Sequence, residues 1–129
     1  MASRNYFING TTELLLLSLL ENKDRYVYEI VKSINEFSGG FLDISQNTIY
    51  AVTYKLGNEG YISEYSVRVG KRRTRVYYHL EPKGAELLQQ VRKHYNRTTI
   101  GIQNIFDTLK AEAKELSKAN KEKEIDDIE

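Results

Sequence analysis

The feature that most constrains the fold of this chain is a change of hydrophobic period near its middle. Apolar residues recur at helical spacing up to Glu59, whereas apolar and polar residues alternate from Tyr61 to Val69 and again from Arg75 to Leu80. Alternation over such short runs is typical of half-buried strands. Two strands flanking Gly70 and a short polar run predict a β-hairpin. The sequence therefore predicts a mainly α chain with a small β-hairpin.

Two helices are predicted near the start of the chain. The first begins around Thr11 and Thr12, whose hydroxyls suit a helix N-terminus, and its nearly all-apolar body to about Glu21 indicates burial on most sides. The second spans residues 26–37 and is ended by a run containing two glycines, Gly39 and Gly40. We expect these helices to pack against each other in one core.

A third helix with two unlike faces is predicted from Gln46 to Glu59, after Ser45 as N-cap. One narrow apolar stripe faces the core, and the other face is polar and includes Thr53. Gln and Asn near a helix start can pair with adenine, and tyrosine or lysine can reach phosphates. The competing interpretation is that the polar residues cap a solvated helix end, and that the tyrosine rings pack in the core with only their hydroxyls in contact with water. The candidate DNA-reading residues are Gln46, Asn47, Thr48, Tyr50, Tyr54 and Lys55.

The predicted hairpin tip concentrates positive charge in a chain whose net charge is only +1. Up to Arg97 the chain has 14 Lys and Arg against 10 Asp and Glu, and from Thr98 it has 5 against 8. Cations on a projecting tip can neutralise phosphates, because counterion release then drives binding. The alternative is an exposed turn whose charges favour solubility and bind no partner. The candidate phosphate contacts are Lys71, Arg72, Arg73 and Arg75.

A long helix is predicted after the hairpin, beginning at Pro82, which suits the first helical position. Its apolar residues recur at the interval of about 3.5 that is typical of coiled coils. A domain of about 80 residues cannot cover such a stripe alone, so we expect a second copy of the chain to cover it. The predicted dimer interface consists of Leu88, Val91, Tyr95, Ile102, Ile105, Phe106 and Leu109. Residues 117–129 are mostly charged, and we expect them to form a disordered tail.

Three helices followed by a basic hairpin are the order of elements in a winged helix-turn-helix. In that motif the third helix enters the major groove and the wing reaches neighbouring phosphates. We therefore expect residues 1–81 to bind DNA, a C-terminal helix over residues 82–116 to form a dimer, and residues 117–129 to follow as the tail. The alternative is a dimeric winged-helix module whose basic tip binds an acidic protein partner, because a fold does not fix a function.

The residues also resemble the PadR-like transcriptional regulators, specifically small members with one helix after the wing. The family's recognition helix and the entry to its first wing strand resemble one run of this sequence. This run extends from Asn47 to Tyr50 and continues through Lys55-Leu56 to Glu59-Gly60-Tyr61-Ile62. Gly70 to Leu80 is similar to the family's basic wing, and Tyr28-Glu29-Ile30 to a third motif. Tyr26-Val27, Ala51 and Thr53 depart from the family pattern.

The resemblance implies a homodimeric repressor that binds a palindromic operator and is released by a small molecule. It also implies that an aromatic residue near the dimer axis can stack on a flat aromatic effector, although core packing explains such a residue equally well. The candidate effector site is Tyr95 with Ile102 and Phe106.

Other classes of function find little support in the composition. The chain has no cysteine, and its two histidines have no ligands at metal-binding spacing, so no metal and no cofactor are expected. No phosphate loop, nucleophile motif or paired carboxylates in an apolar setting suggest an enzyme. The absence of cysteine and of a secretory signal favours the cytoplasm.

Overall fold

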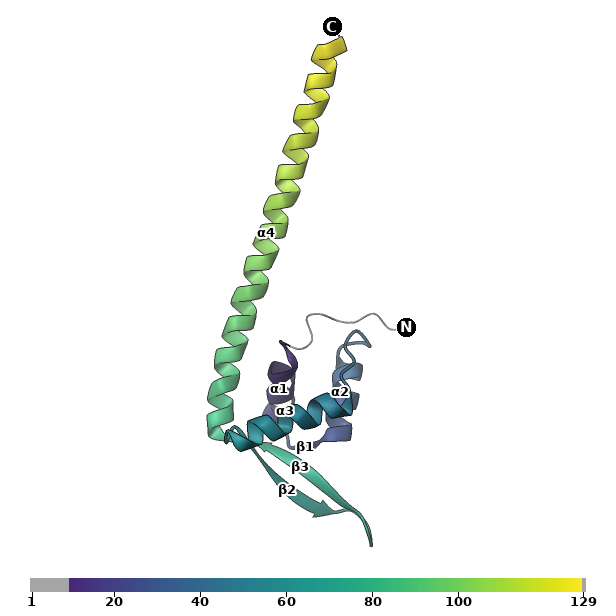
Figure 1. Cartoon of the computed structure of the whole chain (residues 1–129), viewed down its shortest axis with the longest axis vertical. Helices are drawn as coiled ribbons and strands as arrows, with labels where there is room; N and C mark the ends of the chain where they lie inside the picture. Colours follow the sequence, from purple (N-terminus) through teal and green to yellow (C-terminus); the bar gives the residue numbers. More distant parts are fainter. Residues whose placement is uncertain (1–9, 129) are drawn as a thin grey trace. The chain divides into compact units, whose positions relative to one another are not determined.

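The structure is a computed structural model that describes residues 10–128 and has four helices and three short strands in this range (Figure 1). The predicted fold class, a mainly α winged helix with a long C-terminal helix, is confirmed. Residues 1–9 of the predicted DNA-binding part and residue 129 of the predicted tail lie outside the described residues. The elements in chain order are α1 (Thr12–Asn22), β1 (Arg25–Tyr26), α2 (Val27–Phe37), α3 (Gln46–Asn58), β2 (Ile62–Arg68), β3 (Thr74–Leu80) and α4 (Pro82–Ile128).

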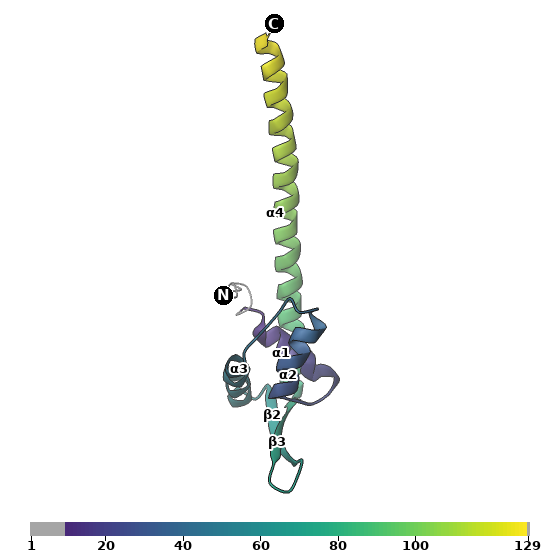
Figure 2. The same ribbon diagram turned by 90° about the vertical axis from the view of Figure 1, so that its right-hand side faces the viewer.

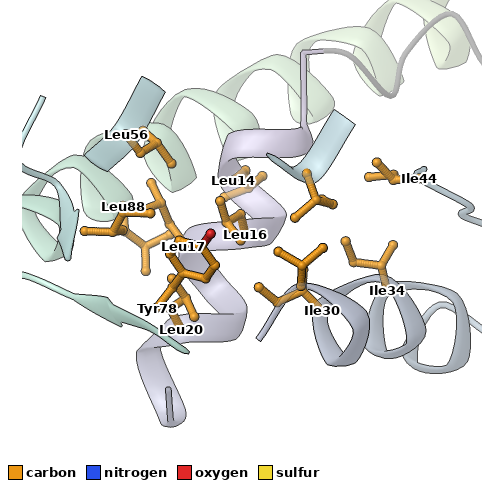
Figure 3. Close-up of a cluster of buried hydrophobic side chains, with 13 residues drawn as sticks. Leu14, Leu16, Leu17, Leu20, Ile30, Ile34, Ile44, Leu56, Tyr78 and Leu88 are labelled. Carbon is orange, nitrogen blue, oxygen red and sulfur yellow. The ribbon is translucent and has the colours of Figure 1, made fainter. Parts of the chain in front are cut away.

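The hydrophobic core is built around α1, whose leucines lie between α2 on one side and α3 with the start of α4 on the other (Figure 3). Leu16 and Leu17 of α1 have no exposed surface, and neither does Ile30 of α2. Burying one such side chain contributes roughly 1.5–3 kcal/mol. The almost uninterrupted apolar run of α1 is therefore explained by contacts on several sides of this helix.

The three strands form an antiparallel sheet in the order β1-β3-β2. The two-residue strand β1 was not predicted, and it pairs Arg25 with Tyr78 of β3. Arg25 is only 7% exposed, because its Nε donates a hydrogen bond to the Leu19 carbonyl oxygen at 2.8 Å and its Nη1 lies 3.8 Å from Glu29 Oε1. This buried arginine joins the sheet to α1 and α2.

The strands β2 and β3 form a hairpin that projects away from helices α1–α3 (Figures 1 and 2). The register places Tyr65 opposite Tyr77 and Glu64 opposite Tyr78. Tyr78 is buried against the helices, whereas Tyr65 lies on the opposite, outer face of the sheet and is exposed. The predicted hairpin is therefore present, with one face in the core and one aromatic face outside it.

The C-terminal helix begins at Pro82 as predicted, but the packing of its first turns and the position of its C-terminal end differ from the prediction. The chain divides into two compact units, Met1–Arg92 and Lys93–Glu129, so the first turns of α4 belong to the same unit as the helix-turn-helix. At the other end α4 continues to Ile128, and the expected disordered tail is helical over its described residues. Residues 110–126 are mostly Lys, Glu, Ala and Leu, and their high helix propensities favour this extension.

Candidate nucleic-acid interface

The N-terminus of α3 presents two of its three predicted base-reading side chains to solvent. Gln46 and Asn47 are exposed. Thr48 takes part in the helix cap instead, because its backbone N–H donates to Ser45 Oγ at 3.2 Å and the two hydroxyl oxygens lie 2.9 Å apart. The capping interpretation left open by the sequence therefore fits Thr48, while Gln46 and Asn47 have the exposure that base contacts require.

The two predicted tyrosines lie side by side along a groove between α3 and the hairpin. Tyr50 is 53% exposed and Tyr54 74% exposed. The groove has a volume of about 470 Å³, and its polar lining includes Asn58 of α3 and Ser63 and Glu64 of β2. These three residues were not predicted, because nothing in the sequence distinguishes them from other polar residues before the hairpin folds beside α3.

The prediction that Thr53 lies on the polar face of α3 was wrong. It is 3% exposed, and its hydroxyl donates to the Tyr50 carbonyl oxygen at 2.9 Å. A threonine hydroxyl bonded to the preceding turn of its own helix needs no water, so the side chain can be buried. Thr53 is therefore a core residue beneath the groove rather than a ligand contact.

Lys55 is exposed but has a partner in the protein. Its Nζ donates to Glu13 Oε1 of α1 at 2.8 Å, and this hydrogen bond, with the negative charge of Glu13, raises the pKa of the lysine. The side chains are 60% and 35% exposed. A phosphate approaching Lys55 would therefore compete with a surface ion pair that solvent screens.

The wing tip is shaped by Arg68, the last residue of β2. Its Nη2 donates to the Lys71 carbonyl oxygen at 2.7 Å and its Nε to the Gly70 carbonyl oxygen at 3.3 Å. The Val69 N–H closes the loop by donating to the Arg73 carbonyl oxygen at 3.0 Å. Arg68 therefore orders the loop through these two carbonyl oxygens.

The remaining wing cations fall into two groups. The side chains of Lys71, Arg72 and Arg73 are exposed, and within residues 10–128 none of them contacts a carboxylate. Arg75 is half-buried instead, with its guanidinium 4.1 Å from the ring centre of Tyr26. Three of the four predicted phosphate contacts thus share the tip, while Arg75 lies on the stem of the hairpin against an aromatic ring.

The predicted dimer residues of α4 also divide in two. Leu88 has no exposed surface and belongs to the core cluster, so its assignment to a dimer interface was wrong. Val91 is half-buried against the same cluster. A heptad pattern cannot distinguish a helix buried by its own domain from one buried by a partner. The other predicted members are 44–59% exposed in this chain: Tyr95, Ile102, Ile105, Phe106 and Leu109.

Within residues 10–128, no helix is long and apolar enough to cross a membrane. The same residues contain no group of three or more His, Cys, Asp or Glu side chains placed to hold a metal ion.

Comparison with known proteins identifies related chains. Residues 16–90 match the model of the transcriptional regulator PadR-like family. An uncharacterized protein of Lysinibacillus sphaericus is 30% identical over 92 residues, which cover 71% of this chain and 84% of the relative.

Solved structures give the same result at the level of the fold. A transcriptional regulator from Clostridium thermocellum superposes with a TM-score of 0.72 at 29% identity, covering 80% of this chain and 97% of that one. Bacillus subtilis PadR in complex with operator DNA gives a TM-score of 0.58 at 25% identity, covering 62% of this chain and 46% of that chain.

Proposed function

Because the chain belongs to the PadR-like family of DNA-binding transcriptional regulators, we propose that it is a repressor that binds a palindromic operator as a homodimer. The observation that supports this proposal best is that one compact unit contains both an exposed polar start of α3 and three exposed cations at the wing tip. The proposed role places the protein in the cytoplasm together with the chromosome. It is a binding role and requires no catalysis.

The proposed contacts follow from exposure and chemistry. Gln46 and Asn47 read base edges in the major groove, because their amides can donate and accept at one adenine. Tyr50 and Tyr54 donate hydroxyl hydrogen bonds to phosphates along the groove. Lys55 reaches a phosphate after leaving Glu13, and Thr48 supports the helix start. Lys71, Arg72, Arg73 and, from the stem, Arg75 provide the wing contacts.

The proposed dimer forms through the apolar residues of α4 beyond Arg92. Five large apolar side chains that are about half exposed are costly to leave in water, and a second copy of the helix would cover them. A two-fold axis would then present the two α3 helices to half-sites about 34–36 Å apart. We propose Tyr95, Ile102 and Phe106 as the effector contacts near this axis, where an aromatic molecule bound between the helices would change their spacing.

Removing two wing cations tests the DNA-binding proposal. The double variant Arg72→Ala/Arg73→Ala should bind all duplexes more weakly, and the slope of log K against log salt should become shallower by about 0.9 for each phosphate that is no longer neutralised. The variant Lys32→Ala/Lys118→Ala is the matched control, because it removes the same charge from residues outside α3, the wing and the proposed dimer contacts. Asn47→Ala should instead reduce the preference for the operator over other sequences.

Binding is measured by fluorescence anisotropy on duplexes from the region upstream of the chain's own coding sequence. If the wing variant and its control lose affinity equally, general charge rather than the wing drives binding. If the wild-type chain binds no duplex but binds an acidic protein through the same arginines, the alternative of a protein-interaction module replaces the proposal.

A further inference from the structure

One carboxylate links the helical part of the domain to both strands of the wing. Asp24 lies in the connection between α1 and β1. Its Oδ2 accepts a hydrogen bond from the Tyr65 hydroxyl of β2 at 2.7 Å, and its Oδ1 lies 2.8 Å from His79 Nδ1 of β3. Because Asp24 carries no hydrogen-bonding proton when ionised, both partners donate to it. The residue therefore bridges two strands that are distant from it in sequence.

This bridge supplements a weak connection in the sheet. The strand β1 has two residues and pairs only with β3, so β2 has no backbone ladder to the helical part of the domain through β1. The outer face adds ring contacts: Tyr65 stacks on Tyr77 with 5.7 Å between ring centres, and Tyr77 meets the edge of Tyr26 with 5.5 Å between ring centres. The hydrogen bond from Tyr65 to Asp24 is thus a direct polar link from β2 across the sheet.

The surroundings of the bridge favour the ionised forms of Asp24 and His79. The hydrogen bond from Tyr65 lowers the pKa of Asp24 and outweighs the opposing effect of burial, while the hydrogen bond and the charge of His79 lower this pKa further. The hydrogen bond to Asp24 raises the pKa of His79, with a further contribution from Glu81. Lys23, beside Asp24 in sequence, has its ammonium 3.9 Å from Glu29.

We propose that Asp24 is a positioning residue for DNA binding: its bridge to Tyr65 and His79 fixes the wing against the helix-turn-helix, and protonation of His79 strengthens the bridge. This inference rests on the proposed function, because it concerns the placement of the wing cations relative to α3. The His79 side chain is 51% exposed, so it can exchange protons with solvent without unfolding of the domain.

The direction of the pH effect follows from the charges. Below the pKa of His79 an imidazolium donates to a carboxylate, whereas above it a neutral imidazole keeps only a weaker hydrogen bond. Affinity for DNA should therefore fall as pH rises through the pKa of His79. The exposed ion pair limits the effect to a factor of about 2–5 between pH of about 6 and about 8.

The experiment measures affinity for a duplex of about 40 bp, long enough to span two half-sites, taken from the region upstream of the chain's own coding sequence. The dissociation constant is compared at the two pH values and fixed ionic strength. The chain contains two histidines, His79 and His94. His94→Gln is the matched control and should retain the pH dependence, whereas His79→Gln should lose it.

Two more variants separate positioning from a direct contact between His79 and a phosphate. Asp24→Asn removes a negative charge, so a direct contact predicts tighter binding, whereas positioning predicts weaker binding and a reduced pH dependence. Tyr65→Phe changes no charge and should weaken binding about 2–5-fold, as expected for loss of a hydrogen bond to a charged group near the surface. Tyr28→Phe, an exposed tyrosine outside the bridge, should match the wild type.

The outcomes distinguish this inference from the proposed function. If the wild-type chain binds DNA but His79→Gln keeps its pH dependence and Tyr65→Phe binds normally, the positioning role is refuted and the DNA-binding role stands. If Asp24→Asn binds more tightly, a direct histidine contact replaces positioning. If the wild-type chain binds no duplex at either pH, the proposed function itself fails.

Discussion

Replacing Gly84 with alanine should destabilise the domain, because this glycine allows the first turn of α4 to lie directly on the chain before β2. A Cβ atom at position 84 would lie 2.1 Å from the Tyr61 carbonyl oxygen and 2.7 Å from Leu80 Cδ1. The first of these atoms belongs to the backbone and cannot rotate away. The Tyr61 carbonyl oxygen also accepts a hydrogen bond from the Glu81 N–H at 3.1 Å, so moving it disturbs the start of the helix.

Two opposing effects set the size of the change. Overpacking of a tight contact costs about 1–3 kcal/mol, and a clash with backbone lies at the upper end of that range. Alanine in place of glycine inside a helix recovers about 1 kcal/mol. The free energy of unfolding should therefore fall by about 2 kcal/mol, which corresponds to a decrease in Tm of roughly 8–16 °C for a domain of this size.

Thermal and urea unfolding followed by circular dichroism will measure the change. Gly57→Ala is the matched control, because Gly57 is also helical, belongs to the same compact unit and has no atom within 4 Å of the added Cβ. This control should leave the Tm unchanged or raise it slightly. A Gly84→Ala protein as stable as Gly57→Ala would refute the argument that close approach at Tyr61 requires glycine.

Three further substitutions or conditions test other parts of the structure. Leu88→Ala should lower the free energy of unfolding by about 2–5 kcal/mol in urea titrations, because Leu88 is a fully buried core residue, and a change only in dimerisation would contradict this. Ser45→Ala should cost about 1 kcal/mol by the same measurement through loss of the cap on the Thr48 N–H. The ion pair of His79 with Asp24 should contribute fully to the free energy of unfolding below about pH 6.5, and this contribution should be lost as pH rises through the raised pKa of His79. Because the pair is exposed, the contribution should be less than about 1 kcal/mol, and it should be absent in Asp24→Asn.

The sequence predicted the elements whose signals are local. The alternating runs on either side of Gly70 gave the hairpin, Ser45 gave the start of α3, and the apolar run from Leu14 gave the central helix of the core. These signals are reliable because period and capping depend on residues a few positions apart. The exposure of Gln46 at the start of α3 followed from the same reasoning.

The features that could not be predicted depend on distant residues or on competing signals. Asp24 and His79 are 55 positions apart, and no pattern connects them before the sheet forms. The strand β1 is too short to alternate. Leu88 fits a heptad whether its own domain or a partner buries it. Near the C-terminus a charged composition indicated disorder, while the propensities of the same residues favoured the helix that is present.

The internal contacts of Arg68 and Arg75 affect how wings of this kind should be compared. One guanidinium is held by carbonyl oxygens of the loop and the other lies on an aromatic ring, so neither is as available to an incoming anion as the three cations at the tip. Two related hairpins with the same number of basic residues can therefore release different numbers of counterions. The placement of arginines along the strands, rather than their total, should then decide how steeply binding responds to salt.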